Sequence, residues 1–145
     1  MYVTQKETSQ IMKILMLFFL LLTTLSFAQT NLALPDENHL RNIRQLTFGG
    51  ENAEAYLSFD EKHLVFQSTR DSFDCDQIFV MDTEGKNVRL ISGGVGRTTC
   101  AYFLPGDERV VYASTIDSGA SCPPPPDRSK GYVWKLYESF EIYSN

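Results

Sequence analysis

The sequence predicts an all-β protein made of β-propeller blades, each a four-stranded antiparallel meander, with an incomplete set of blades. First, residues 45–50 (Gln-Leu-Thr-Phe-Gly-Gly) are similar to residues 89–94 (Arg-Leu-Ile-Ser-Gly-Gly), which lie 44 residues later. Second, Leu64–Thr69 is similar to Val110–Thr115, which lies 46 residues later. A repeat of roughly 40–45 residues with several short strands per unit is typical of propeller blades. We therefore expect a partial propeller over residues 45–145, with blade one at about 45–92 and a truncated blade two at about 93–145.

The length of the chain limits how many blades it holds. A closed propeller needs roughly four to eight blades, which at about 44 residues each means at least roughly 180 residues. The chain has 145 residues, enough for one full unit and most of a second. We therefore expect it to be a fragment of a larger protein.

The strands of both units are expected in the same order, as short apolar or alternating runs separated by turns. Residues 45–48 are expected to be the outer strand of a preceding blade. The strands of blade one are expected at residues 56–59, 63–69, 77–81 and 88–92, and those of blade two at residues 102–104, 109–115 and 141–145. The second unit departs from the first after Asp117, where a 23-residue excursion runs to Phe140 and contains Pro123–Pro126. Because this excursion carries too many aromatic residues for a disordered loop, we expect it to fold over one face of the propeller.

The N-terminal residues have the pattern of an export signal. Lys13 is followed by an apolar run, residues 14–25, and then by Ser26-Phe27-Ala28, which predicts a signal-peptide helix within residues 1–28. A membrane span needs about 20 apolar residues, so no span is expected after removal of the signal. Residues 29–44 are expected to form a leader segment, and the mature protein is expected to be periplasmic or secreted.

The repeat itself resembles a known family. The segments Leu46–Gly50, Ala55–Asp60, Val65–Asp71 and Gln77–Asp82 look like the TolB-like β-propeller repeat. The resemblance implies an exported propeller used for protein contacts and does not imply catalysis. The family repeat usually turns with Ser-Pro-Asp-Gly, whereas this chain has Ser58-Phe59-Asp60-Glu61.

Three cysteines follow the predicted signal, and exported thiols tend to pair. In a propeller the loop between second and third strands shares a face with the loop entering the next inner strand, which places Cys75, Cys100 and Cys122 on one face. Their spacings of 25 and 22 residues fit no zinc motif, and no metal site is expected. We favour a Cys100–Cys122 disulfide, with Cys75–Cys122 as the alternative.

The candidate binding residues are Arg97, Thr98, Thr99, Tyr132 and Trp134. The first three lead into the inner strand of blade two, where the guanidinium and two hydroxyls could hold a carboxylate. The alternative is that Arg97 only satisfies carbonyls of its own loop. The last two belong to the aromatic cluster of the long excursion, so residues 97–100 and 121–140 are the expected contact surfaces.

The sequence contains no recognisable catalytic motif. There is no Gly-x-Ser-x-Gly elbow, neither histidine has an evident partner, and there is no phosphate loop. A formal net charge of −5 and the lack of a basic stripe argue against nucleic acid. We expect a non-enzymatic scaffold, with no cofactor or small-molecule ligand, that binds a protein partner in the cell envelope. The alternative is an accessory propeller of a larger secreted hydrolase, prolyl-oligopeptidase-like or amidohydrolase-like, whose catalytic part is missing.

Overall fold

The structure is a computed structural model that describes residues 32–133 and 135–145. The predicted signal peptide and Trp134 therefore lie outside the described residues. The chain divides into two units, Met1–Arg44 and Gln45–Asn145. In the described part of the first unit, residues 32–44, there are turns but no strand or helix. No helix of the described residues is long and apolar enough to span a bilayer.

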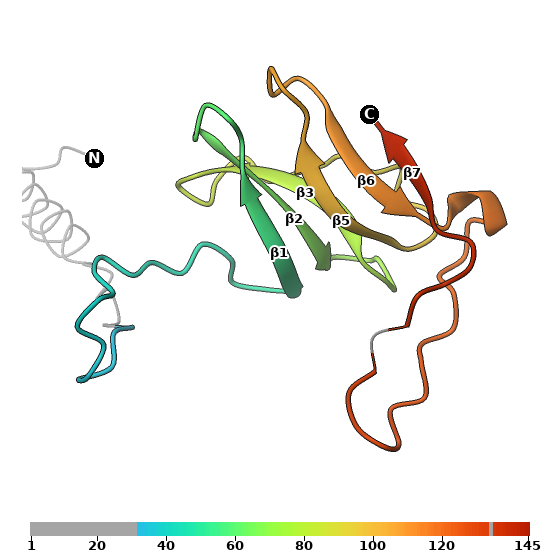
Figure 1. Cartoon of the computed structure of the whole chain (residues 1–145), viewed down its shortest axis with the longest axis horizontal. Coiled ribbons are helices and arrows are strands. Elements are labelled where there is room, and N and C mark those ends of the chain that lie inside the picture. Colours follow the sequence, from blue (N-terminus) through green and yellow to red (C-terminus); the bar gives the residue numbers. More distant parts are fainter. Residues whose placement is uncertain (1–31, 134) are drawn as a thin grey trace, which may run out of the picture. The chain divides into compact units, whose positions relative to one another are not determined.

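The second unit consists of two antiparallel sheets, and its described residues contain no α-helix, which confirms the predicted all-β class (Figure 1). In each sheet, strands that follow one another in sequence are neighbours. The first sheet contains β1 (Glu51–Leu57), β2 (His63–Thr69), β3 (Gln77–Asp82) and β4 (Arg89–Leu90). The second sheet contains β5 (Thr98–Phe103), β6 (Val110–Ser114) and β7 (Glu141–Ser144), with a short 3₁₀ turn, η1 (Ile116–Ser118), between β6 and β7.

The predicted strand boundaries agree best with the observed ones where the side chains are most buried. Strand β2 has the predicted bounds, and β3 and β7 differ from the prediction by one residue at their C-terminal ends. Strand β1 begins five residues and β5 four residues earlier than predicted, because their first residues are mainly polar and show no apolar pattern. The strand predicted at residues 45–48 is wrong, since this segment pairs with no strand.

The first two strands of each sheet pair in the same way. The pairing of the first two strands shifts after Ala53 in the first sheet and after Thr99 in the second, positions 46 residues apart. Each β-bulge contains a non-glycine residue in the left-handed region, Glu54 (φ 49°) and Cys100 (φ 52°), again 46 residues apart. Such bulges are specific backbone features rather than irregularities. The sequence repeat is therefore also a repeat of backbone geometry.

A shared core joins the two sheets face to face. Strand β5 lies across β2 and β3 (Figure 1). The core side chains are at most 3% exposed, and each large one stabilises the fold by about 1.5–3 kcal/mol. They are Val65, Ile78 and Val80 from the first sheet and Ala101, Phe103 and Val110 from the second.

A second cluster covers the other face of the first sheet. It contains Phe66, Phe79 and Met81, with Leu46 from the segment before β1 packed against it. The Leu46 backbone approaches so closely that a Cβ added to Gly85 (φ +75°) would lie 2.7 Å from the Leu46 carbonyl oxygen. Residues 45–48 therefore cover the sheet instead of extending one, and β3 is buried on both faces.

A hydrogen-bonded turn follows β1 in the first sheet. Ser58 Oγ donates to Asp60 Oδ1 (2.7 Å), and this bond, followed by that of Lys62, lowers the Asp60 pKa from its ordinary 3.8 to about 2. Glu61 takes a left-handed conformation (φ 59°), which glycine adopts more readily than other residues. The equivalent residue of the second sheet, Asp107 (φ 61°), accepts hydrogen bonds from the Phe59 and Asp60 backbone N–H groups at 2.8 and 2.9 Å. Its carboxylate therefore ties the two sheets together at this turn.

Candidate functional site

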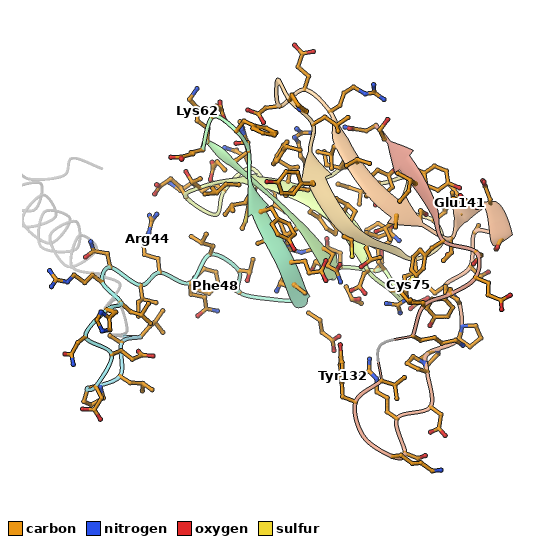
Figure 2. All side chains as sticks on the ribbon, viewed as in Figure 1. Arg44, Phe48, Lys62, Cys75, Tyr132 and Glu141 are labelled. Carbon is orange, nitrogen blue, oxygen red and sulfur yellow. A yellow bond between two sulfur atoms is a disulfide. The ribbon has the colours of Figure 1, made fainter. Side chains whose placement is uncertain are left out.

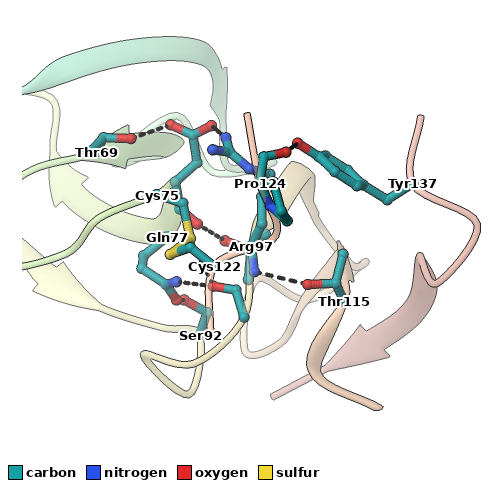
Figure 3. Close-up of a disulfide and its surroundings, with 12 residues drawn as sticks. Thr69, Cys75, Gln77, Ser92, Arg97, Thr115, Cys122, Pro124 and Tyr137 are labelled. Carbon is teal, nitrogen blue, oxygen red and sulfur yellow. Dashed lines mark hydrogen bonds and ion pairs between the residues drawn. A yellow bond between two sulfur atoms is a disulfide. The ribbon is translucent and has the colours of Figure 1, made fainter. Parts of the chain in front are cut away.

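A disulfide anchors the long loop between β6 and β7 to the first sheet. It joins Cys75, in the loop between β2 and β3, to Cys122, with a Cα–Cα distance of 5.9 Å (Figure 3). The favoured Cys100–Cys122 pairing is therefore wrong, and the alternative is present. Cys100 is an exposed free thiol. It is not at the end of a loop, as expected, because β5 begins at Thr98 and places Cys100 inside the strand, in its bulge.

Buried polar groups fix the loop that enters β5. Gln77 Nε2 donates to the Gly96 carbonyl (2.7 Å), and Ser92 Oγ donates to Gln77 Oε1 (2.7 Å) while accepting the Ile78 N–H (3.0 Å). On the other side of this loop, the Arg97 N–H donates to Thr115 Oγ1 (3.0 Å; Figure 3). Because these groups satisfy one another, they act as a rigid support rather than as a binding surface.

Arg97 holds a carboxylate of the protein itself. Its Nη1 lies 2.6 Å from Asp76 Oδ2, and Thr69 Oγ1 donates to Asp76 Oδ1 (2.8 Å). Thr98 is buried, and both its backbone N–H and its hydroxyl donate to the Asp76 carbonyl (2.9 and 3.0 Å). Of the predicted triplet, Arg97 and Thr99 line a cleft while Thr98 belongs to the support. Arg97 Nε is buried without a hydrogen-bond partner among the described residues.

Thr99 connects the bulge of β5 to the first sheet. Gln67 Oε1 accepts hydrogen bonds from the Thr99 hydroxyl (2.8 Å) and the Cys100 N–H (3.2 Å). Partial burial raises the pKa of the Cys100 thiol, and the nearby Glu54 carboxylate adds to the effect. The sequence prediction missed Gln67, although strand alternation places this polar residue on the same face as the core residue Val65, which is a usable signal.

These residues form one wall of a cleft with a volume of about 240 Å³. The strand wall contains Ala53, Glu54, Gln67 and Thr99, with Asp76 and Arg97 beside them. The long loop supplies the other wall with two prolines, one valine, three aromatic residues and two cations: Pro125, Pro126, Val133, Tyr132, Tyr137, Phe140, Arg128 and Lys135. Tyr132, a predicted binding residue, stands out from the loop and is 77% exposed (Figure 2). Trp134, the other predicted aromatic, lies outside the described residues.

Contacts within the loop give this wall a definite shape. Tyr137 Oη donates to the Pro124 carbonyl (2.8 Å; Figure 3), and the Tyr137 ring lies 5.8 Å from that of Phe140. The Asp127 carboxylate accepts hydrogen bonds from the Ser129 N–H and hydroxyl, which lowers the Asp127 pKa. These contacts give the long excursion internal order.

The fold and the cleft define an all-β protein with two packed antiparallel sheets and a long loop that a disulfide ties to the first sheet. No protein-family model or curated protein matches the sequence, and no solved structure matches the fold. Within residues 32–133 and 135–145, no group of three or more histidine, cysteine or acidic side chains is placed to hold a metal ion. The repeat and the cleft are thus the two features from which a function follows.

Proposed function

We propose that this chain is part of an exported, TolB-like β-propeller that acts as a non-catalytic scaffold and binds a protein partner in the periplasm or cell envelope. The observation that carries the proposal is the pair of successive antiparallel meanders with the same bulge 46 residues apart. Meanders packed face to face in sequence order are the building principle of propellers.

Two further observations support export. The N-terminal residues have the pattern of a signal peptide, with an apolar run at 14–25. The Cys75–Cys122 disulfide belongs to an oxidising compartment, because cytosolic thiols are kept reduced.

The chemistry around the cleft favours binding over catalysis. A nucleophilic cysteine needs a lowered pKa, whereas the pKa of the Cys100 thiol beside the cleft is raised by burial and by Glu54. Among the described residues that line the cleft, there is no histidine that could act as a general base. Its aromatic and arginine side chains instead resemble the composition of protein-binding surfaces.

A photocrosslinking experiment in the native cell envelope tests the proposal. A photoreactive phenylalanine analogue replaces Tyr132 in the cleft, or Phe59, which is also exposed but lies in the turn after β1. We expect a discrete protein adduct from position 132, none from position 59, and both variants in the envelope or extracellular fraction. Cytoplasmic localisation, or equal labelling from both positions, would contradict the proposal. An adduct with a hydrolase domain of the same polypeptide would instead favour the accessory-domain alternative.

A further inference from the structure

The charge of the cleft is opposite to that of the chain. The whole chain has 18 acidic and 13 basic residues, yet the three cations of the lining outnumber its two carboxylates. The Asp76 carboxylate is occupied by Arg97 and Thr69. Each of the Arg128 and Lys135 side chains lies against an aromatic ring, and neither forms an ion pair with a described residue. These two cations are therefore available to a ligand.

Aromatic rings hold both cations in place. The Arg128 guanidinium carbon lies 5.8 Å from the centre of the Tyr132 ring, and Lys135 Nζ lies 4.8 Å from the centre of the Tyr137 ring. Contact with a ring face leaves the N–H groups of the cation free to donate to a carboxylate. A side chain that is already positioned also loses less conformational entropy when a ligand binds.

The strand wall of the cleft offers a ligand hydrogen-bond donors more than acceptors. The Oε1 atom of Gln67 already accepts two hydrogen bonds, so its amide nitrogen is the group left for a ligand. Arg97 Nε has no partner among the described residues, but it is buried, so its N–H reaches a ligand only if the Arg97 side chain moves. Glu54 is the one carboxylate of the lining that is not held by Arg97. A ligand rich in acceptors satisfies this wall, provided that it places no negative charge next to Glu54.

The size of the cleft favours side chains over a cofactor. Its volume of about 240 Å³ is below the roughly 300–1,000 Å³ typical of small-molecule sites. The prolines and tyrosines of the loop wall suit an extended peptide, whose backbone can lie along them.

We infer that the cleft recognises an extended acidic peptide segment of the partner, with Arg128 and Lys135 binding its carboxylates and Glu54 excluding a third acidic side chain. This inference rests on the proposed function, because it names the kind of segment by which the partner is held.

A peptide array tests the inference with the full chain. The probes are eight-residue peptides of matched aromatic and proline content, which carry glutamate, glutamine or lysine at each position in turn. We expect glutamate peptides to bind about tenfold more tightly than their glutamine counterparts. This preference is expected to weaken as ionic strength rises from about 0.05 to 0.5 M.

Two double variants with the same charge change locate the effect. R128Q/K135Q is expected to remove the glutamate preference. The control K86Q/K130Q changes two exposed lysines outside the lining, one of them in the same loop, and is expected to keep the preference. An intact Cys75–Cys122 disulfide and an unchanged melting temperature confirm that both variants are folded.

The outcomes separate this inference from the proposed function. If peptides bind without an acidic preference, if none binds, or if K86Q/K130Q loses as much preference as R128Q/K135Q, the inference is wrong. The proposed function still stands in those cases as long as position 132 crosslinks to an envelope protein. If that crosslink is absent too, both are wrong.

Discussion

Removal of the Cys75–Cys122 disulfide is expected to destabilise the second unit strongly. The bond closes a loop with a sequence separation of 47 residues, which in the chain-entropy model corresponds to about 4 kcal/mol at room temperature. Because the bond also anchors the wall of the cleft that carries Tyr132, its loss should release that wall from the first sheet. We therefore expect a double variant, C75A/C122A, to lose both stability and the position-132 crosslink.

The matched control is C100S, which removes the exposed free thiol and leaves the disulfide intact. Urea unfolding of the full chain, followed by tryptophan fluorescence and circular dichroism, measures the free energy of unfolding for each variant. Alkylation of the unreduced protein followed by mass spectrometry counts the free thiols. We expect one alkylated thiol in the unmodified chain, none in C100S, and a change of less than about 0.5 kcal/mol for C100S.

Two results would refute this reasoning. If peptide mapping of the unreduced chain finds Cys100 bound to Cys122, the anchoring of the loop is wrong. If C75A/C122A unfolds at the same urea concentration as the unmodified chain, the bond does not constrain the unfolded state as the chain-entropy model requires.

Three further predictions concern the support of the site. G85A should lower the free energy of unfolding by at least about 1 kcal/mol more than G106A does. Both glycines have positive φ, but only a Cβ at Gly85 meets a backbone carbonyl, at 2.7 Å. Equal losses in urea unfolding would contradict the close packing of Leu46 against Gly85. D107N should cost about 1 kcal/mol, since an amide offers a single acceptor oxygen to the two N–H groups that the carboxylate now satisfies, while E108Q at the neighbouring exposed position should change little. The folded-state pKa of Asp60 lies below its ordinary value of 3.8, at about 2. The ionised Asp60 carboxylate therefore stabilises the folded state above pH 3.8, and this stabilisation is lost as the pH falls toward about 2. In D60N the urea midpoint should depend less on pH over this range, and an unchanged pH dependence would contradict the assignment.

The sequence predicts the parts of the fold where burial imposes a pattern. Strand β2 is recognisable because it is rich in apolar, β-branched and aromatic residues, and β3 because it is buried on both faces. The 46-residue repeat predicts that β6 is the equivalent of β2. In contrast, residues 45–48 have strand-like composition but cover a sheet face through Leu46. Apolar composition alone does not distinguish a segment that pairs from one that packs.

The site is less predictable, because its geometry depends on contacts between the two sheets. Arg97, Thr99 and Tyr132 were expected to bind a ligand, and all three line the cleft. Gln67, the hydrogen-bond partner of Thr99, comes from another strand, at a distance along the chain that no local motif spans. The favoured disulfide was wrong because Cys100 lies in a bulge, and a bulge without glycine leaves no mark in the sequence.

The two repeats retain a common backbone and differ where the cleft is built. Glu54 and Cys100 share a left-handed conformation and a place in the register, although their side chains have nothing in common. The connection after the second strand, in contrast, is short in the first sheet (residues 70–76) and long in the second (residues 115–140). The disulfide joins these two unequal connections, and the strand wall takes residues from both sheets. A single meander would therefore lack the cleft, and changes to the long loop can alter its ligand without disturbing the repeated backbone that supports it.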